Sequence, residues 1–173
     1  MFRSRPTAPP GHPPPLRQLQ FVPDPRTAPP ASVADGTSAR VFRETTVART
    51  PEAPCFLAVS FRLKLVRGGA HAWFETESIL NTPLFVGFPG FTSKLWLGHD
   101  GNELYRGLYE WDGAERAERY ARSLWRVLEI GCEPESIDFR VFAGLRRDAV
   151  LSNPRLLDHH APDEQQAWWR PAP

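Results

Sequence analysis

The chain has 173 residues, with 21 basic and 20 acidic side chains, which is the size of one ordinary domain with almost no net charge. This balance argues against a polybasic nucleic-acid binder, and no apolar run approaches the ~20 residues that span a bilayer. Two cysteines are too few for a disulfide framework, and the basic start is followed by no apolar signal core. We therefore expect a cytoplasmic protein with two reduced thiols, no membrane segment and no nucleic-acid partner.

Prolines divide the chain, because twelve of the nineteen lie in residues 1–54. Proline lacks an amide donor and restricts the residue before it, and this stretch has few large apolar residues. We therefore predict that residues 1–54 are a disordered proline-rich N-terminal extension. It would act as a linker or dispensable arm, with a specific proline-rich ligand as the less favoured alternative. Residues 41–47 could form a short strand on the domain.

Strands are predicted where apolar residues alternate. The pattern is clear over 55–66 and 136–142, and 91–97 and 103–111 flank a turn cluster at 98–102 and should form a hairpin. Helices are predicted over 70–82, which Pro83 ends, and from Asp112 to Gly131. The helical period places six residues on one face of the second helix, which we expect to be buried: Ala117, Tyr120, Ala121, Leu124, Val127 and Leu128. Asp112 would cap the second helix with Glu115 as the carboxylate of its first turn.

This order is β-α-β-β-α-β, which predicts an α+β fold of the ferredoxin-like type, an antiparallel sheet with both helices on one face. The domain would span 55–153, followed by an irregular tail over 154–173 in which Trp168 and Trp169 could dock. Because both helices cover one face, the other face would need a partner, and an isologous homodimer is the simplest solution.

Several residues in this order resemble a known family. They are Pro89-Gly90-Phe91, Lys94 and Trp96, Gly107-Leu108-Tyr109, Trp111-Asp112, Val141-Phe142 and Leu151-Ser152. Over residues 55–155 the pattern is similar to the YdhR-like monooxygenase family of the dimeric α/β-barrel superfamily. The long proline-rich start, the longer hairpin turn and Arg106 with Glu110 on the third strand depart from it. The resemblance implies a dimer that closes an eight-stranded barrel, with a small-molecule pocket between sheet and helices.

Aromatic side chains are the main sign of a site. By strand alternation Tyr105, Gly107, Tyr109 and Trp111 share one face of the third strand, as Thr92, Lys94 and Trp96 do on the second. With Trp73 on the first helix, these rings would form walls suited to a flat aromatic ligand. The alternative is an aromatic core or a dimer interface, where the same residue types are favoured.

Polar candidates accompany these rings. A buried Lys94 would have a lowered pKa and could act in acid–base chemistry or anchor an anion; otherwise it reaches solvent at the sheet edge or pairs with Glu110. His71 could handle a proton instead, while a metal pair with Glu75 is disfavoured because no third ligand is evident. Asn81 could orient a substrate carbonyl, although capping the helix is the simpler role.

No nucleotide motif and no nucleophile elbow occurs in the sequence, so we expect no cofactor and no metal. The hypothesis is a cofactor-independent monooxygenase acting on a phenolic or anthrone-like metabolite. Trp96, Tyr109 and Trp111 would stack the ring, while Lys94 or His71 handles the proton. A non-catalytic dimeric module that binds an aromatic or apolar small molecule is the alternative, and a structural dimer with the arm as a tether is a third.

Overall fold

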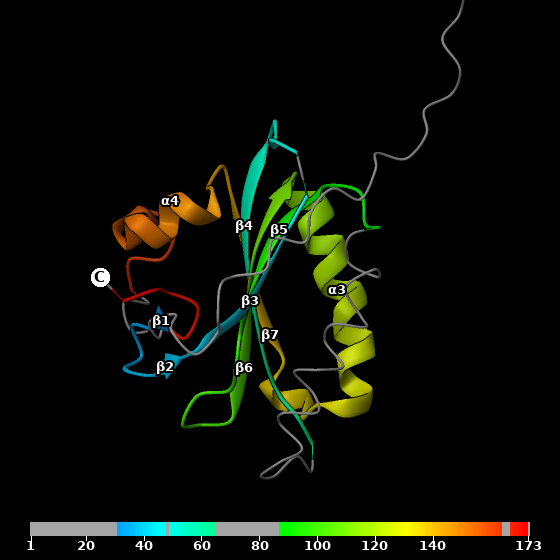
Figure 1. The fold of residues 1–173 in the computed structure, drawn as a ribbon, viewed down its shortest axis with the longest axis vertical. Helices are drawn as coiled ribbons and strands as arrows, with labels where there is room; N and C mark the ends of the chain where they lie inside the picture. The colour runs from blue at the N-terminus through cyan, green and yellow to red at the C-terminus, as the bar shows by residue number, and fades with distance from the viewer. Residues whose placement is uncertain (1–30, 48, 65–86, 164–166, 173) are drawn as a thin grey trace, which may run out of the picture.

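A five-stranded antiparallel sheet forms the centre of the protein (Figure 1). The computed structural model describes residues 31–47, 49–64, 87–163 and 167–172. In the order in which they lie side by side, the strands are β3 (Val41–Thr46), β5 (Phe91–Leu97), β6 (Leu104–Asp112), β4 (Pro54–Arg62) and β7 (Asp138–Ala143). The fold is α+β, and this sheet is consistent with the predicted ferredoxin-like type. The first predicted helix, 70–82, lies outside the described residues.

The predicted strands are confirmed with small shifts at their ends. β5 has the predicted bounds, and it pairs with β6 as the predicted antiparallel hairpin. β4 pairs with β6 and β7, and its side chains are buried on both faces of the sheet. Cys55, Leu57 and Val59 point to one side of the sheet and Phe56 and Ala58 to the other.

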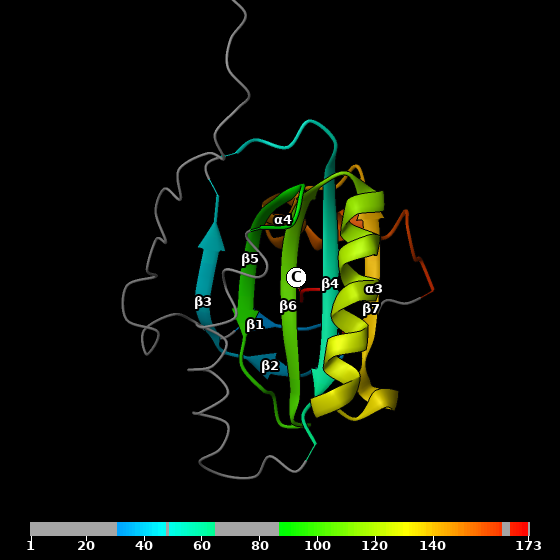
Figure 2. The ribbon, with the colours of Figure 1, turned by 90° about the vertical axis from the view of Figure 1, so that its right-hand side faces the viewer.

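The long helix α3 (Ala114–Gly131) covers one face of the sheet, over β4, β6 and β7 (Figure 2). Its buried side is formed by Ala117, Tyr120 and Ala121, as the helical spacing predicted, but Val127, which the same spacing placed on this face, is 65% exposed. The predicted cap is wrong, because Gly113 precedes the helix and no side chain caps it. Asp112 instead accepts backbone hydrogen bonds from residues 52 and 53 at 3.0 and 2.9 Å, which fasten the start of β4.

The opposite face carries a second layer that the sequence did not predict (Figure 1). After β7 the chain forms α4 (Arg147–Ser152) and a 3-10 turn, η2 (Pro154–Leu157), and the C-terminal segment then returns across the sheet. Trp169 is 2% exposed and its ring lies 4.9 Å from that of Phe142. A second short turn, η1 (Pro134–Ser136), joins α3 to β7. One hydrophobic core therefore lies on each face of the sheet, beneath α3 on one side and beneath α4 and Trp169 on the other.

This arrangement corrects one expectation, that the second face of the sheet is bare. The helix α4 was not predicted and lies on the face opposite α3, whereas the helix expected beside α3, 70–82, lies outside the described residues. Apart from η2, the described part of the tail has no helix or strand, as predicted, and it packs against the sheet. Val150, Leu157 and Trp169 cover the face that was expected to be bare. The homodimer thus loses the uncovered face from which it was predicted.

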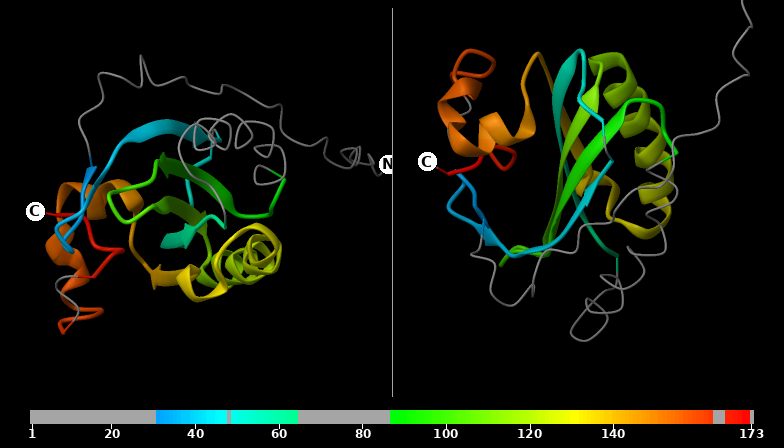
Figure 3. Two further views of the ribbon diagram at one scale, coloured as in Figure 1. Left: turned by 90° about the horizontal axis from the view of Figure 1, so that it is seen from below. Right: turned by 45° about the horizontal axis from the view of Figure 1, so that its top comes forward.

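The domain also begins earlier than residue 55. The predicted strand near residue 41 is β3, an edge of the main sheet, and β1 (Ala31–Ser32) pairs with β2 (Ser38–Ala39) before it. The strand β1 and the C-terminal segment lie side by side (Figure 3), where the backbone N–H of Ala34 donates to the carbonyl of Arg170 and that of Ala172 to the carbonyl of Ser32. The predicted boundary at residue 54 is therefore wrong for residues 31–47, because long-range pairing, which local composition does not report, holds them.

Candidate functional site

A lysine and two aromatic rings meet on the α3-facing side of β5 and β6. Lys94 is paired across the strands with Tyr109, and Trp96 follows two residues later on the same face. The Lys94 Nζ atom lies 3.1 Å from the centre of the Trp96 ring and 4.7 Å from that of Tyr109. The structure thus brings together three residues that the sequence singled out, and we refer to them as the Lys94 cluster.

The Lys94 amine is held away from water, with 5% of the residue exposed. Burial lowers the pKa of this ammonium well below its usual range, and the positive charge of Arg43 lowers the pKa further. The two ring faces work in the opposite direction, since a desolvated cation–π contact favours the charged form by about 2 kcal/mol. The effective penalty for removing an ion from water is several kcal/mol, so the net direction is downward.

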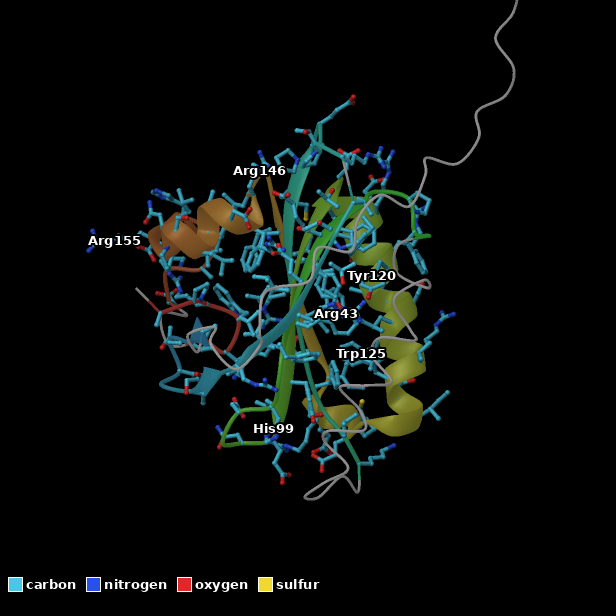
Figure 4. All side chains as sticks on the ribbon, viewed as in Figure 1. Arg43, His99, Tyr120, Trp125, Arg146 and Arg155 are labelled. Carbon is cyan, nitrogen blue, oxygen red and sulfur yellow. The ribbon has the colours of Figure 1, made fainter. Side chains whose placement is uncertain are left out.

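The strand β3 supplies the outer side of the cluster. Thr45 is paired with Lys94 across the strands, and its hydroxyl accepts a hydrogen bond of 3.1 Å from the Trp96 indole. The Arg43 guanidinium carbon lies 5.6 Å from the centre of the same indole. Figure 4 shows Arg43 and Tyr120 on the α3 side of the sheet. A strand from the segment expected to be disordered therefore helps to fix the Trp96 ring.

Tyr120 is a member of this region that the sequence analysis placed only in the core. Its hydroxyl donates to that of Tyr109 at 3.3 Å, and both side chains are buried. Burial raises the pKa of each phenol, so both stay protonated at neutral pH. Because a hydroxyl carries one proton, a Tyr120 that donates to Tyr109 leaves the Tyr109 proton to be donated elsewhere. The helical spacing predicted that Tyr120 is buried, but it did not predict the hydrogen bond to Tyr109.

Gly107 makes room for the Tyr109 ring. A Cβ atom at residue 107 would lie 2.7 Å from the ring carbon Cε2 of Tyr109 and 3.0 Å from its hydroxyl oxygen. Gly107 is also paired with Trp96 across the strands. The absent side chain lets the Tyr109 ring lean along the strand, toward the position opposite Trp96.

Trp111 lies farther along the same face of β6. It is fully buried, and its ring is 4.8 Å from that of Tyr120 and 5.7 Å from that of Phe91. A bulge in β5 between Phe91 and Ser93 places Phe91 on this face, which strict alternation would not allow. Within the described part of the chain the Trp111 indole N–H has no hydrogen-bond acceptor. It is a buried donor in a predominantly apolar wall.

The remaining predicted residues are not part of the Lys94 cluster. Tyr105 shares the face but lies at the hairpin end of β6, where its ring stacks on Phe61 at 5.7 Å. His71, Trp73 and Asn81, together with Glu75, fall outside the described residues.

The predicted alternative of a Lys94–Glu110 pair is wrong, because the two residues lie on opposite faces of the sheet. Glu110 is bound instead by Arg146, with a distance of 3.0 Å between Nε and Oε1. Arg106, which shares that face, pairs with Asp100 at 2.7 Å and Asp35 at 3.1 Å. The charged residues of β6 therefore hold the second layer and leave the α3 face to lysine and aromatic side chains.

Thiol and metal chemistry have less support than the Lys94 cluster in the described residues. Cys55 and Cys132 are free and buried, and burial raises the pKa of each thiol to about 11, so neither is a thiolate at neutral pH. No group of three histidine, cysteine or acidic side chains in the described ranges is arranged to hold a metal ion. No helix among them is long and apolar enough to cross a membrane.

Comparison with known proteins gives no relative: no family model, no curated protein and no solved structure matches the chain.

Proposed function

We propose that this protein is a small-molecule enzyme that oxidises a phenolic or anthrone-like metabolite without a cofactor. The observation that carries the proposal is the Lys94 cluster, a buried amine of lowered pKa between two aromatic rings. The resemblance over residues 55–155 to YdhR-like monooxygenases supports the same reaction class.

Lys94 is suited to accept the substrate proton. A buried amine whose pKa is lowered can act as a general base, and the ammonium it becomes is the counter-ion of the phenolate. The phenolate donates an electron to dioxygen, and the resulting radicals combine at a ring carbon. One oxygen atom stays on that carbon as a carbonyl, and the other leaves as water with two hydrogens of the substrate. The substrate is thus its own reductant.

The rings and hydroxyls have binding roles in this proposal. Trp96, Tyr109 and Trp111 stack on or flank the aromatic substrate, and the Tyr109 hydroxyl, supported by Tyr120, donates to its oxygen. The unsatisfied Trp111 N–H is a second donor for a substrate oxygen. A buried donor without an acceptor is costly, and a ligand oxygen would remove that cost.

Oxygen consumption with a panel of phenols and anthrones tests this function. Lys94→Met should lower the rate about 10²–10⁴-fold, the usual contribution of a general base. Lys64→Met is the matched control, because Lys64 is the only other lysine, is exposed and donates to the Glu129 carbonyl at the end of α3. An unchanged rate in Lys94→Met would contradict the proposal.

Ligand binding without oxygen consumption would favour the second function, a non-catalytic module for aromatic metabolites. The buried donors of Tyr109 and Trp111 serve such binding equally well. Quenching of tryptophan fluorescence by the same panel measures binding separately from turnover. Failure of every compound to bind would refute both functions.

A further inference from the structure

The basic side chain of Arg43 beside the Lys94 cluster points to a second chemical capability of this site. Arg43 lies on β3 across from Trp96, and Lys94 lies on β5 two residues before Trp96. The guanidinium carbon of Arg43 and the Nζ atom of Lys94 both face the Trp96 ring, at 5.6 and 3.1 Å from its centre. Two basic side chains thus share one indole, with Lys94 buried and Arg43 half-buried.

We propose that Lys94 is a nucleophilic amine that forms a Schiff base with a small aldehyde or ketone, and that its burial and the neighbouring Arg43 activate it for this reaction. Lysines are activated for this reaction by desolvation or by a neighbouring cation, and both conditions are present here. The inference rests on the site of the proposed function, but it does not depend on the oxidation step.

The reaction balances with groups that the site contains. The lone pair of Nζ adds to the carbonyl carbon, and the carbonyl oxygen takes up a proton to give a carbinolamine. Loss of the hydroxyl group as water then forms the carbon–nitrogen double bond, and the second nitrogen proton leaves. Tyr109 stays protonated because burial raises its pKa, and its ring centre is 4.7 Å from Nζ, so we assign its hydroxyl as the donor for the departing oxygen.

The surrounding rings favour a carbonyl compound of a particular kind. Trp96 and Tyr109 offer aromatic faces to the group attached to the carbonyl, and the absent side chain of Gly107 lets the Tyr109 ring lie toward Trp96. An aryl aldehyde or aryl ketone combines the electrophile that Lys94 needs with a flat ring that can stack.

The chain offers an internal comparison, because it has two lysines in different environments. The protein is treated with benzaldehyde and sodium cyanoborohydride at neutral pH, so that any imine is reduced to a stable benzyl amine. Peptide mapping by mass spectrometry then separates the labels on Lys94, Lys64 and the N-terminal amine. Each unit by which a pKa is lowered raises the uncharged fraction tenfold, so we expect Lys94 to react about ten times faster than Lys64, or more.

Arg43 variants test the cause of the reactivity. In Arg43→Gln the neighbouring charge is gone, so the pH dependence of Lys94 labelling should move to higher pH. Arg43→Lys keeps the charge and should restore the original profile. Arg40→Gln, an exposed position near the start of β3, is the control for a general change in net charge. A purely structural role for Arg43 would lower labelling at every pH without moving the profile.

The result that would overturn the proposal is labelling of Lys64 and the N-terminal amine in the native protein with Lys94 labelled only after unfolding in urea. An unmoved pH profile in Arg43→Gln would overturn the role of Arg43. Labelling of Lys94 in a protein that consumes no oxygen would support this inference and contradict the monooxygenase function. Oxygen consumption by a protein whose Lys94 is not labelled would support the monooxygenase function and contradict this inference.

Discussion

Replacing Arg106 by methionine should destabilise the protein strongly, because this residue joins segments that are distant in sequence. Its guanidinium pairs with Asp100 and Asp35 and also donates to the Thr37 hydroxyl and the Trp168 carbonyl. The side chains of Arg106 and Asp100 are 1% and 0% exposed. Removing the cation therefore leaves a buried carboxylate without its counter-ion.

Loss of one partner of a buried ion pair costs about 3–5 kcal/mol. Here the lower end applies, because Asp100 keeps two backbone donors, from Asn102 at 2.7 Å and Leu104 at 3.1 Å. A loss of about 3 kcal/mol moves the urea midpoint by about 1–3 M, given the usual dependence of about 1–3 kcal/mol per M. Equilibrium urea unfolding followed by circular dichroism measures this shift.

An exposed arginine of α3 provides the matched control. Arg122 pairs with Glu118 at 2.6 Å, but its side chain is 69% exposed, so Arg122→Met should cost about 0.5 kcal/mol or less. Adding Asp100→Asn to Arg106→Met should recover part of the loss, since the uncompensated charge is then removed. A loss below about 1 kcal/mol in Arg106→Met, or no recovery in the double variant, would refute the reasoning.

Acid should reduce the effect of the Arg106 substitution. The hydrogen bonds from Arg106 and from the backbone outweigh burial and hold the pKa of Asp100 below its ordinary value. The carboxylate therefore adds stability above its unfolded pKa near 3.9, and that stability is lost as the pH falls through the lower, folded value. The difference in unfolding free energy between Arg106→Met and the wild type should narrow in the same range.

Three further perturbations test other parts of the structure. Gly107→Ala should cost about 1–3 kcal/mol, because its Cβ meets the Tyr109 ring, whereas Gly101→Ala, with open space around its Cβ, should not; thermal unfolding compares them. Deleting residues 1–50 should destabilise the protein much more than deleting residues 1–30, since only the longer deletion removes β3; equal unfolding midpoints would contradict the assignment of β3 to the domain. Lys94→Met should be more stable than the wild type at pH 7, and this difference in unfolding free energy should shrink toward pH 10. The reason is that a lowered Lys94 pKa in the folded state makes folding release a proton, so the wild type gains stability as the pH rises. Urea unfolding at both pH values measures the difference, and a constant difference would argue against a lowered Lys94 pKa.

Local pattern was sufficient for the strands and for the long helix. Alternation over 91–97 and 103–111 follows from the geometry of extended chain, so it predicted both the hairpin and the shared face of Lys94, Trp96 and Tyr109. The 3.6-residue period likewise placed Tyr120 on the buried side of α3. These features depend on neighbours within a few residues, which the sequence displays directly.

The end of a strand or the partner of a polar group depends on residues far away in the chain. Composition made residues 31–47 look like part of a disordered arm, yet β3 pairs with β5 about fifty residues later, and Thr45 binds the Trp96 indole. Spacing suggested that Lys94 could pair with Glu110, but the register of β5 and β6 puts them on opposite faces.

The sequence by itself determined an α+β chain with an aromatic strand face and one lysine within it. Only the tertiary structure decided that this lysine is buried beside Arg43, that Tyr109 receives a hydrogen bond from Tyr120, and that α4 and Trp169 cover the other face of the sheet. The physical reason is that burial and charge proximity, which set the pKa of Lys94, arise from contacts between strands and helices distant in sequence.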